Sequence, residues 1–154
     1  MTKEGTILLV EDNPDDEALT IRALQKNNIV NPIVVARDGA EALERLFGNG
    51  RLTDRPSLIL LDLKIPKVGG LDVLRRIRAS EATKLIPVVI LTSSKQEEDV
   101  VAGYRSGANA YVQKPVNFGE FTEAVRALGL FWLLVNEPVP VGCPRATDAD
   151  PLGT

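Results

Sequence analysis

The sequence predicts an α/β fold in which five short strands alternate with helices and form one parallel sheet. Short apolar runs bounded by turn residues recur along the chain, as expected of strands buried on both faces of a sheet. Segments with the helical spacing of apolar residues lie between these runs, and such alternation implies a parallel sheet with helices on both faces. The clearest run is Ser57–Leu61, which leads directly into a single carboxylate, Asp62.

The first predicted strand and helix follow one another closely. Thr6–Val10 is an apolar run that ends in Glu11 and Asp12. The next residues, Asn13-Pro14, are typical of a helix start, since Asn is a good N-cap and Pro is favoured at the first helical position. Acidic residues 15–17 fill the first turn, where the helix dipole favours negative charge. We expect this helix to end at Asn27-Asn28.

The second strand and helix are shorter. Ile33–Ala36 is β-branched and is predicted as a strand, and Asp38-Gly39 marks the turn after it. Apolar residues from Ala40 to Phe47 have helical spacing, and the glycines that follow stop the helix. A polar connection, Arg51–Pro56, leads into the strand that ends at Asp62.

The second half of the chain repeats the pattern. Apolar residues from Leu71 to Ala79 predict a third helix, and Pro87–Leu91 a fourth strand with its proline at the tolerated first position. Glu97–Gly107 fits a fourth helix and Ala108–Val112 a fifth strand. Asn117 can cap a last helix that reaches Leu128.

Right-handed crossovers leave few topologies for such a chain. The flavodoxin-like, doubly wound (βα)5 fold with strand order 2-1-3-4-5 fits best. We expect one domain over residues 5–128, an extension of the last helix over 129–138 and a disordered tail over 139–154, where Pro, Gly, Thr and Asp replace the periodic pattern.

Composition narrows the possible functions. The chain has 154 residues, of which 44% are hydrophobic and 25% charged, as in an ordinary soluble domain. A net charge of −3 argues against nucleic acid as the main partner, because phosphate backbones favour a basic surface. The absence of histidine excludes catalysis by Ser-His-Asp or Cys-His sets. Any phosphohistidine donor must therefore belong to another protein.

The expected location is the cytoplasm. Cys143 is the only cysteine, so no intramolecular disulfide can form, which fits a reducing compartment. The N-terminus has no signal-peptide pattern, and no apolar run approaches the ~18 residues needed to span a membrane.

Four predicted strands end in a chemically useful group. These groups are Glu11 with Asp12, Asp62, Thr92 and Lys114. Parallel strands place all of these ends on one edge of the sheet, where α/β proteins bind their ligands. Carboxylates that meet there would repel one another unless a hard cation such as Mg²⁺ binds between them. Asp62 could then attack phosphorus, because a carboxylate can act as a covalent nucleophile.

With these residues the chain resembles a response-regulator receiver domain of two-component signalling. The resemblance covers about residues 6–128. It is carried by the stretches ILLVEDNPDD from Ile7, LILLDLKIPKVGG from Leu58, PVVILTSS from Pro87 and YVQKP from Tyr111. The protein would then be a signalling protein that catalyses only its own phosphorylation and slow dephosphorylation.

The resemblance implies a role for each matching residue. Asp62 matches the phosphorylated aspartate, Asp12 a direct Mg²⁺ ligand, and Glu11 an acid that acts mainly through bound water. Lys64 matches the position whose backbone carbonyl binds the metal, and the amides of Lys64 and Ser93 would hold phosphate oxygens. Thr92 matches the switch hydroxyl, Lys114 the pocket lysine and Tyr111 the switch aromatic.

The resemblance also implies partners. The donor would be a sensor histidine kinase, and within the family the chain is similar to small regulators paired with phytochrome-type kinases. The features are the Glu11–Asp16 run, the Arg51–Pro56 insertion and the apolar segment of Phe131, Trp132, Leu133 and Leu134. No output domain is expected, so the protein would act by docking, dimerisation or relay to a downstream phosphotransfer protein.

Several alternatives remain at this point. The apolar segment either packs on its own domain or forms a symmetric dimer contact. A haloacid-dehalogenase-type phosphatase would need a second aspartate where Lys64 stands, and a cofactor-binding flavodoxin-like module would need a hydroxyl-rich loop where Glu11 and Asp12 stand. A pseudo-receiver that signals without phosphorylation is the main alternative function.

Overall fold

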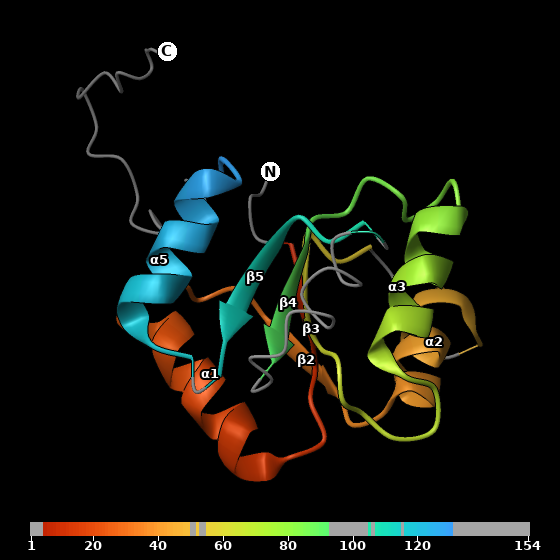
Figure 1. Cartoon of the computed structure of the whole chain (residues 1–154), viewed down its shortest axis with the longest axis horizontal. Coiled ribbons are helices and arrows are strands. Elements are labelled where there is room, and N and C mark those ends of the chain that lie inside the picture. The colour runs from red at the N-terminus through yellow and green to blue at the C-terminus, as the bar shows by residue number, and fades with distance from the viewer. Residues whose placement is uncertain are drawn as a thin grey trace.

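Five parallel strands form one sheet at the centre of the molecule (Figure 1). The computed structural model describes residues 5–49, 52, 55–92, 105, 107–114 and 116–130. The strands are β1 (Ile7–Val10), β2 (Ile33–Ala36), β3 (Leu58–Asp62), β4 (Val88–Thr92) and β5 (Ala110–Gln113). Their order is β2-β1-β3-β4-β5, so the predicted flavodoxin-like topology is confirmed.

Within the part of the chain that the structure describes, two helices cover each face of the sheet. The helices α1 (Pro14–Lys26) and α5 (Phe118–Ala127) lie side by side on one face, and α2 (Gly39–Phe47) and α3 (Gly70–Ala79) lie on the other (Figure 1). The first turn of α1 is capped by Asn13, whose side chain accepts hydrogen bonds from the Asp15 and Asp16 amides. The fourth predicted helix, Glu97–Gly107, falls almost entirely outside the described residues.

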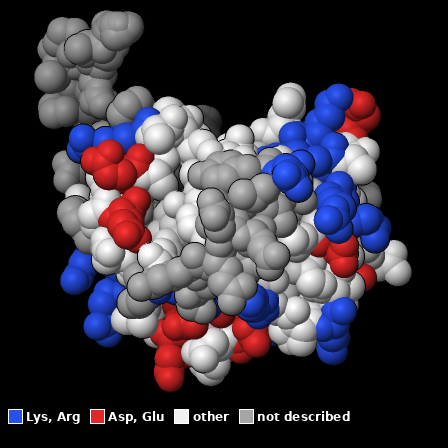
Figure 2. Space-filling view, viewed as in Figure 1, with Lys and Arg blue, Asp and Glu red and all other residues white. Residues whose placement is uncertain are grey.

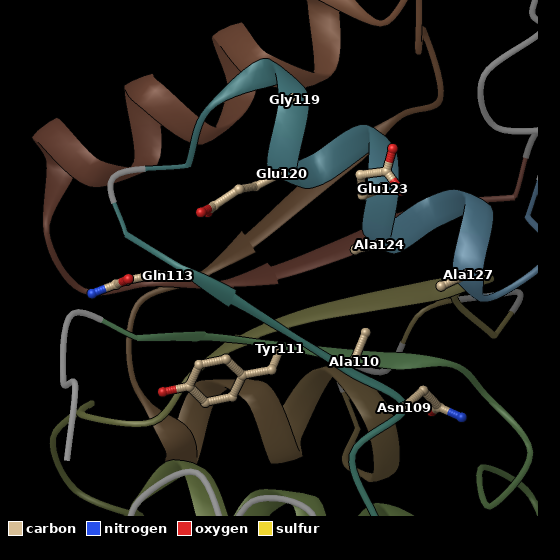
Figure 3. Close-up of a pocket in the computed structure, with 9 residues that line it drawn as sticks. All are labelled: Asn109, Ala110, Tyr111, Gln113, Gly119, Glu120, Glu123, Ala124 and Ala127. Carbon is tan, nitrogen blue, oxygen red and sulfur yellow. The ribbon is translucent and has the colours of Figure 1, made fainter. Parts of the chain in front are cut away.

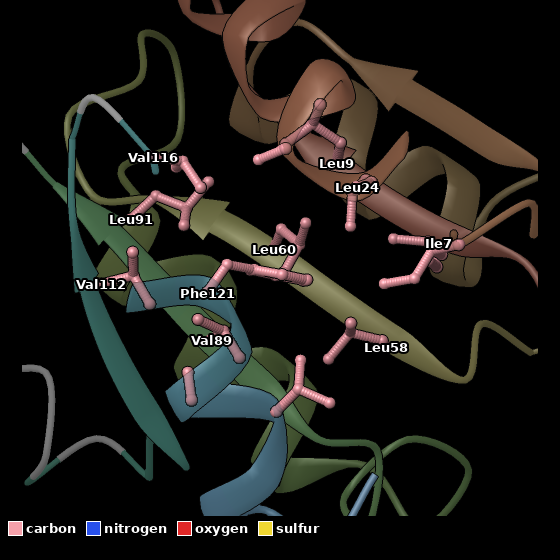
Figure 4. Packing of buried hydrophobic residues seen from close by; sticks show 14 of the residues in the cluster. Ile7, Leu9, Leu24, Leu58, Leu60, Val89, Leu91, Val112, Val116 and Phe121 are labelled. Atoms are coloured by element: carbon pink, nitrogen blue, oxygen red, sulfur yellow. The ribbon is translucent and has the colours of Figure 1, made fainter. Parts of the chain in front are cut away.

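The alternation of side chains along each strand explains why both faces are covered. In β1, Ile7 and Leu9 pack toward α1 and α5, whereas Leu8 and Val10 pack toward α2 and α3. Figure 4 shows the first of these clusters, in which Phe121 of α5 lies against β-strand residues such as Leu60 and Val89. All four residues of β1 and the first four of β3 are fully buried, which fixes the register of the strands that carry the site.

Element boundaries differ from the predictions by a few residues. Both β3 and β4 extend one residue further and include Asp62 and Thr92 as their last residues. The strand β5 runs from Ala110 to Gln113, so it begins two residues later and ends one residue later than predicted. Before it, Asn109 contacts the start of β4 twice: its amide donates to the Val88 carbonyl at 2.9 Å, and its side chain accepts from the Val88 amide at 2.8 Å. The helix α5 ends at Ala127, and Gly129 follows with a φ of 74°. The predicted extension and tail beyond residue 130 lie outside the described residues.

A close approach of two loops supports the end of β3. The Gly39 amide at the start of α2 donates a hydrogen bond to the Pro66 carbonyl at 3.2 Å. A Cβ on Gly39 would lie 1.8 Å from the Val68 carbonyl oxygen, so no other residue fits without displacing the loop. The loop that follows Asp62 is therefore seated on α2.

Candidate phosphoacceptor site

The carboxyl ends of β1, β3 and β5 bring four predicted site residues together. Glu11 and Asp12 follow β1, Asp62 ends β3, and Lys114 follows β5. Glu11 is fully buried and Asp62 is 3% exposed, whereas Asp12 is exposed. Acidic side chains gather at the lower edge of the molecule, below the strand ends (Figure 2). The side chains at these strand ends therefore lie close together, as the sequence predicts.

Lys114 is the central cation of this pocket. Its side chain is 8% exposed and its Nζ donates to Glu11 Oε1 at 3.0 Å and to Asp62 Oδ2 at 2.9 Å. Nζ also donates to Asp16 Oδ2 at 2.9 Å. A buried ammonium needs such partners, because the cost of desolvating the charge exceeds what one ion pair returns. Lys114 thus links the ends of β1, β3 and β5 and the first turn of α1.

The close approach of these charged groups shifts the pKa values of Glu11 and Lys114. Burial, and after it the nearby charge of Asp62, raise the pKa of Glu11 to about 7, although Lys114 opposes both effects. Burial alone would lower the pKa of Lys114, but its hydrogen bonds to Asp16, Asp62 and Glu11 raise it above the usual lysine range. Lys114 is therefore charged at any physiological pH, and one lysine does not fully neutralise the carboxylates around it.

The acidic residues have the composition of a divalent cation site. Glu11, Asp12 and Asp62 each offer a carboxylate oxygen, and these oxygens lie within 4.8 Å of one another. Hard cations such as Mg²⁺ take oxygen ligands and keep several waters, so the exposure of Asp12 is compatible with such a site. The pKa of Glu11 is raised mainly by burial and secondly by the charge of Asp62, and a cation bound by both carboxylates would oppose both effects.

The backbone after β3 helps to orient Asp62. The Lys64 amide donates to Asp62 Oδ1 at 3.0 Å, while Lys114 donates to Oδ2. Each oxygen of the carboxylate thus has a donor of its own. The side chain of Lys64 is exposed at the rim of the pocket.

The other predicted site residues are placed only in part. Thr92 ends β4 one residue beyond the position that pairs with Asp62, so its backbone lies at the same edge of the sheet. Ser93 and the apolar segment of Phe131, Trp132, Leu133 and Leu134 lie outside the described residues. Tyr111 lies on the edge strand β5, opposite Ile90 of β4, and is partly buried.

Tyr111 borders a groove of about 660 Å³ between β5 and α5. In Figure 3 its ring points away from α5, whereas Glu120 projects from α5 above β5. The predicted switch aromatic thus borders the groove, while its ring packs against the apolar cluster on the face of the sheet that α2 and α3 cover.

Asp16 is a pocket residue that the sequence analysis did not identify. In the sequence it is a first-turn acid of α1, with the same favourable position in the helix dipole as Asp15. The helical phase distinguishes the two once Asn13 is the N-cap, because Asp16 then faces the strand ends while Asp15 is exposed. The residue pattern alone contains no signal for a contact to Lys114, 98 positions along the chain.

Fold and pocket together define a receiver domain. Residues 7–126 match the family model "Response regulator receiver domain", and the chain belongs to this family. In the described residues no helix is long and apolar enough to cross a membrane.

Similar proteins include phytochrome response regulators. Response regulator Rcp1 of Synechocystis is 40% identical over 129 residues, which cover 82% of this chain and 88% of Rcp1. The bacteriophytochrome response regulator AtBRR is 49% identical in its solved structure, with a TM-score of 0.77 over 88% of this chain and all of AtBRR.

Two further structures bear on the pocket. Rcp1 has been solved in a Mn²⁺-bound form, with 37% identity and a TM-score of 0.68 over 88% of this chain and 99% of that one. A phosphorylated form of the phytochrome response regulator RcpA is 37% identical, with a TM-score of 0.70 over 89% of this chain and 99% of that one.

Proposed function

We propose that this receiver domain accepts a phosphoryl group on Asp62 from a sensor histidine kinase, with a divalent cation bound in the acidic pocket. The observation that carries the proposal is the position of Asp62, whose two oxygens face the Lys64 amide and the Lys114 ammonium at 3.0 and 2.9 Å. These donors would stabilise the negative charge that gathers on the phosphoryl oxygens during transfer.

The transfer balances without any further reactant. An oxygen of the Asp62 carboxylate attacks the phosphorus of the kinase phosphohistidine, and a P–O bond forms as the P–N bond breaks. The electron pair of the broken bond stays on the imidazole nitrogen. Hydrolysis of the acyl phosphate by water later returns the free carboxylate and inorganic phosphate.

The cation would be held by Glu11, Asp12, Asp62 and the backbone carbonyl of Lys64, with Mg²⁺ as the expected ion. Bound there, it supplies positive charge against the phosphoryl oxygens. Binding of Mn²⁺ by Rcp1 and phosphorylation of RcpA support the same chemistry in this chain.

Phosphorylation would be read out by the family switch. The Thr92 hydroxyl and the Ser93 amide would bind phosphoryl oxygens, and Tyr111 would turn inward. The groove between β5 and α5 lies where such a change would reach the surface. Similarity to AtBRR and Rcp1 supports a phytochrome-type kinase as the donor, and output by docking, dimerisation or relay to a phosphotransfer protein.

The test is an intact-mass measurement after incubation with acetyl phosphate and Mg²⁺. We expect a gain of one phosphoryl group by the wild type and none by Asp62→Asn or by wild type in the presence of a chelator. Folded wild type that gains no phosphoryl group from acetyl phosphate or from any of a panel of kinase domains would contradict the proposal and favour the pseudo-receiver alternative.

Dimerisation through Phe131, Trp132, Leu133 and Leu134 is proposed as a separate property. Light scattering of the full chain and of a form that ends at Leu130 tests it. A dimer that the shorter form lacks is expected. Monomers in both samples would exclude this dimer.

A further inference from the structure

Asp16 differs from the other partners of Lys114 in one respect. Lys114 donates to three carboxylates, and two of them, Glu11 and Asp62, also belong to the group whose oxygens could hold a cation. Asp16 does not belong to that group, although its oxygen lies as close to Nζ as that of Asp62, at 2.9 Å. Asp16 is therefore the one carboxylate partner of Lys114 in this group that a bound cation would not coordinate.

Cation binding and the lysine compete for the same charges. Nζ contacts both oxygens of Glu11, at 3.0 and 3.2 Å, and one oxygen of Asp62. A divalent cation coordinated by these carboxylates would repel the ammonium, and it can bind tightly only if Lys114 withdraws at low cost. A residue that offers Lys114 another acceptor lowers that cost, which is a coupling between two binding events.

We propose that Asp16 is a positioning residue that holds Lys114 at the side of the pocket nearest α1 and so frees Glu11 and Asp62 for a divalent cation. The inference goes beyond the proposed function and rests on its cation site. The Asn13 cap supports it, because the bonds from the Asp15 and Asp16 amides to Asn13 Oδ1, at 2.8 and 3.0 Å, fix the turn from which Asp16 projects.

Asp15 provides a matched control. It has the same charge, precedes Asp16 in the same turn and is exposed, whereas the Asp16 side chain is 30% exposed and reaches Lys114. Asp15→Asn removes one negative charge near the pocket without removing a partner of the lysine. Asp16→Asn removes both, and Asp16→Glu keeps the charge with a longer reach.

The experiment is a Mg²⁺ titration of the full-length protein by calorimetry, with folding verified by circular dichroism. We expect Asp16→Asn to raise the dissociation constant for Mg²⁺ about tenfold or more, since loss of the nearby charge and tighter seating of Lys114 act in the same direction. Asp16→Glu should recover most of the affinity, and Asp15→Asn should change it about twofold at most.

A double-mutant cycle with Lys114→Met isolates the contribution of the lysine. If Asp16 acts through Lys114, Asp16→Asn should weaken Mg²⁺ binding at least about threefold more in the wild-type background than in the Lys114→Met background. Equal effects in the two backgrounds, or no effect in either, would overturn the inference, as would a wild type that binds no Mg²⁺.

The phosphorylation readout separates this inference from the proposed function. With acetyl phosphate we expect the Mg²⁺ concentration that gives half of the maximal rate to rise in Asp16→Asn by the same factor as the dissociation constant, and to stay within about twofold of wild type in Asp15→Asn. A wild type that binds Mg²⁺ but never gains a phosphoryl group would contradict the proposed function. The double-mutant cycle would still test the inference, because its readout is Mg²⁺ affinity. A phosphorylated wild type whose cycle shows no coupling would contradict only the inference.

Discussion

Glu11 is a fully buried carboxyl group whose ionisation the surrounding protein disfavours. Its side chain is fully buried, and burial together with Asp62 raises its pKa from 4.5 to about 7. A carboxyl with a raised pKa binds more protons in the folded than in the unfolded state between these two values. Its contribution to stability is therefore fully present below about pH 4.5 and is lost as the pH rises toward 7.

This gives a pH prediction for the metal-free protein. Between about pH 5 and pH 8 the wild type should lose up to about 3 kcal/mol more unfolding free energy than Glu11→Gln, in which no proton can dissociate. Urea unfolding in the presence of a chelator measures the difference. Glu44→Gln, an exposed change on α2, serves as the control and should behave like the wild type. Parallel pH profiles for wild type and Glu11→Gln would contradict the assignment.

At the scale of elements, the contact between α2 and the loop after β3 deserves a direct test. Gly39→Ala places a Cβ against the Val68 carbonyl oxygen, and overpacking of this kind costs about 1–3 kcal/mol. Gly69→Ala is the matched control, because nothing lies within 4 Å of its added Cβ and the φ of −67° suits any residue. Urea unfolding should therefore separate the two glycines. Equal stability of both variants would show that the loop moves freely.

Arg78 joins three segments at the opposite edge of the sheet. From α3 its guanidinium donates to the Gly107, Lys84 and Ile86 carbonyls, at 2.8, 2.9 and 2.7 Å, and to the Asn109 side chain. These bonds fix the entries of β4 and β5, the strands that carry Thr92 and Lys114 at their other ends.

The hydrogen bonds of Arg78 predict that its substitution lowers the unfolding free energy substantially. Arg78→Ala should lower the unfolding free energy by about 2–4 kcal/mol, because it leaves several carbonyls without their charged donor. Arg78→Lys should recover less than half, since one ammonium cannot reproduce the planar fork. Arg76→Ala, which loses a cation–π contact with Phe47, should cost about 1 kcal/mol or less in the same urea experiment. Similar losses at Arg76 and Arg78 would exclude the role of Arg78.

The elements also show which features the sequence could predict. Strand order, both helical layers and the meeting of Glu11, Asp62 and Lys114 follow from local patterns, because parallel strands must end on the same edge. Contacts such as Asp16 to Lys114 and Arg78 to Gly107 depend on the reach and direction of single side chains between distant segments. Polar residues of this kind have no periodicity, so only the folded geometry identifies their partners.

At the scale of the whole molecule, the pocket connects parts of the chain that are far apart in sequence. Its acids come from the ends of β1 and β3 and from α1, and its lysine follows β5. These segments meet around the carboxylates of Glu11, Asp16 and Asp62, which Lys114 alone neutralises incompletely. Cation binding should therefore stabilise the entire fold and not only the pocket, because the ligands are brought together only when the sheet is formed.

This reasoning predicts a thermal shift. A cation at about a hundred times its dissociation constant adds about 2.7 kcal/mol to the folded state. For a chain of this length that corresponds to a rise in Tm of about 5–10 °C, measurable by scanning calorimetry with and without Mg²⁺ at constant ionic strength. Asp12→Asn should fold normally because Asp12 is exposed, yet it should lose most of the shift. A shift of equal size in Asp12→Asn would mean that the cation binds elsewhere on the protein.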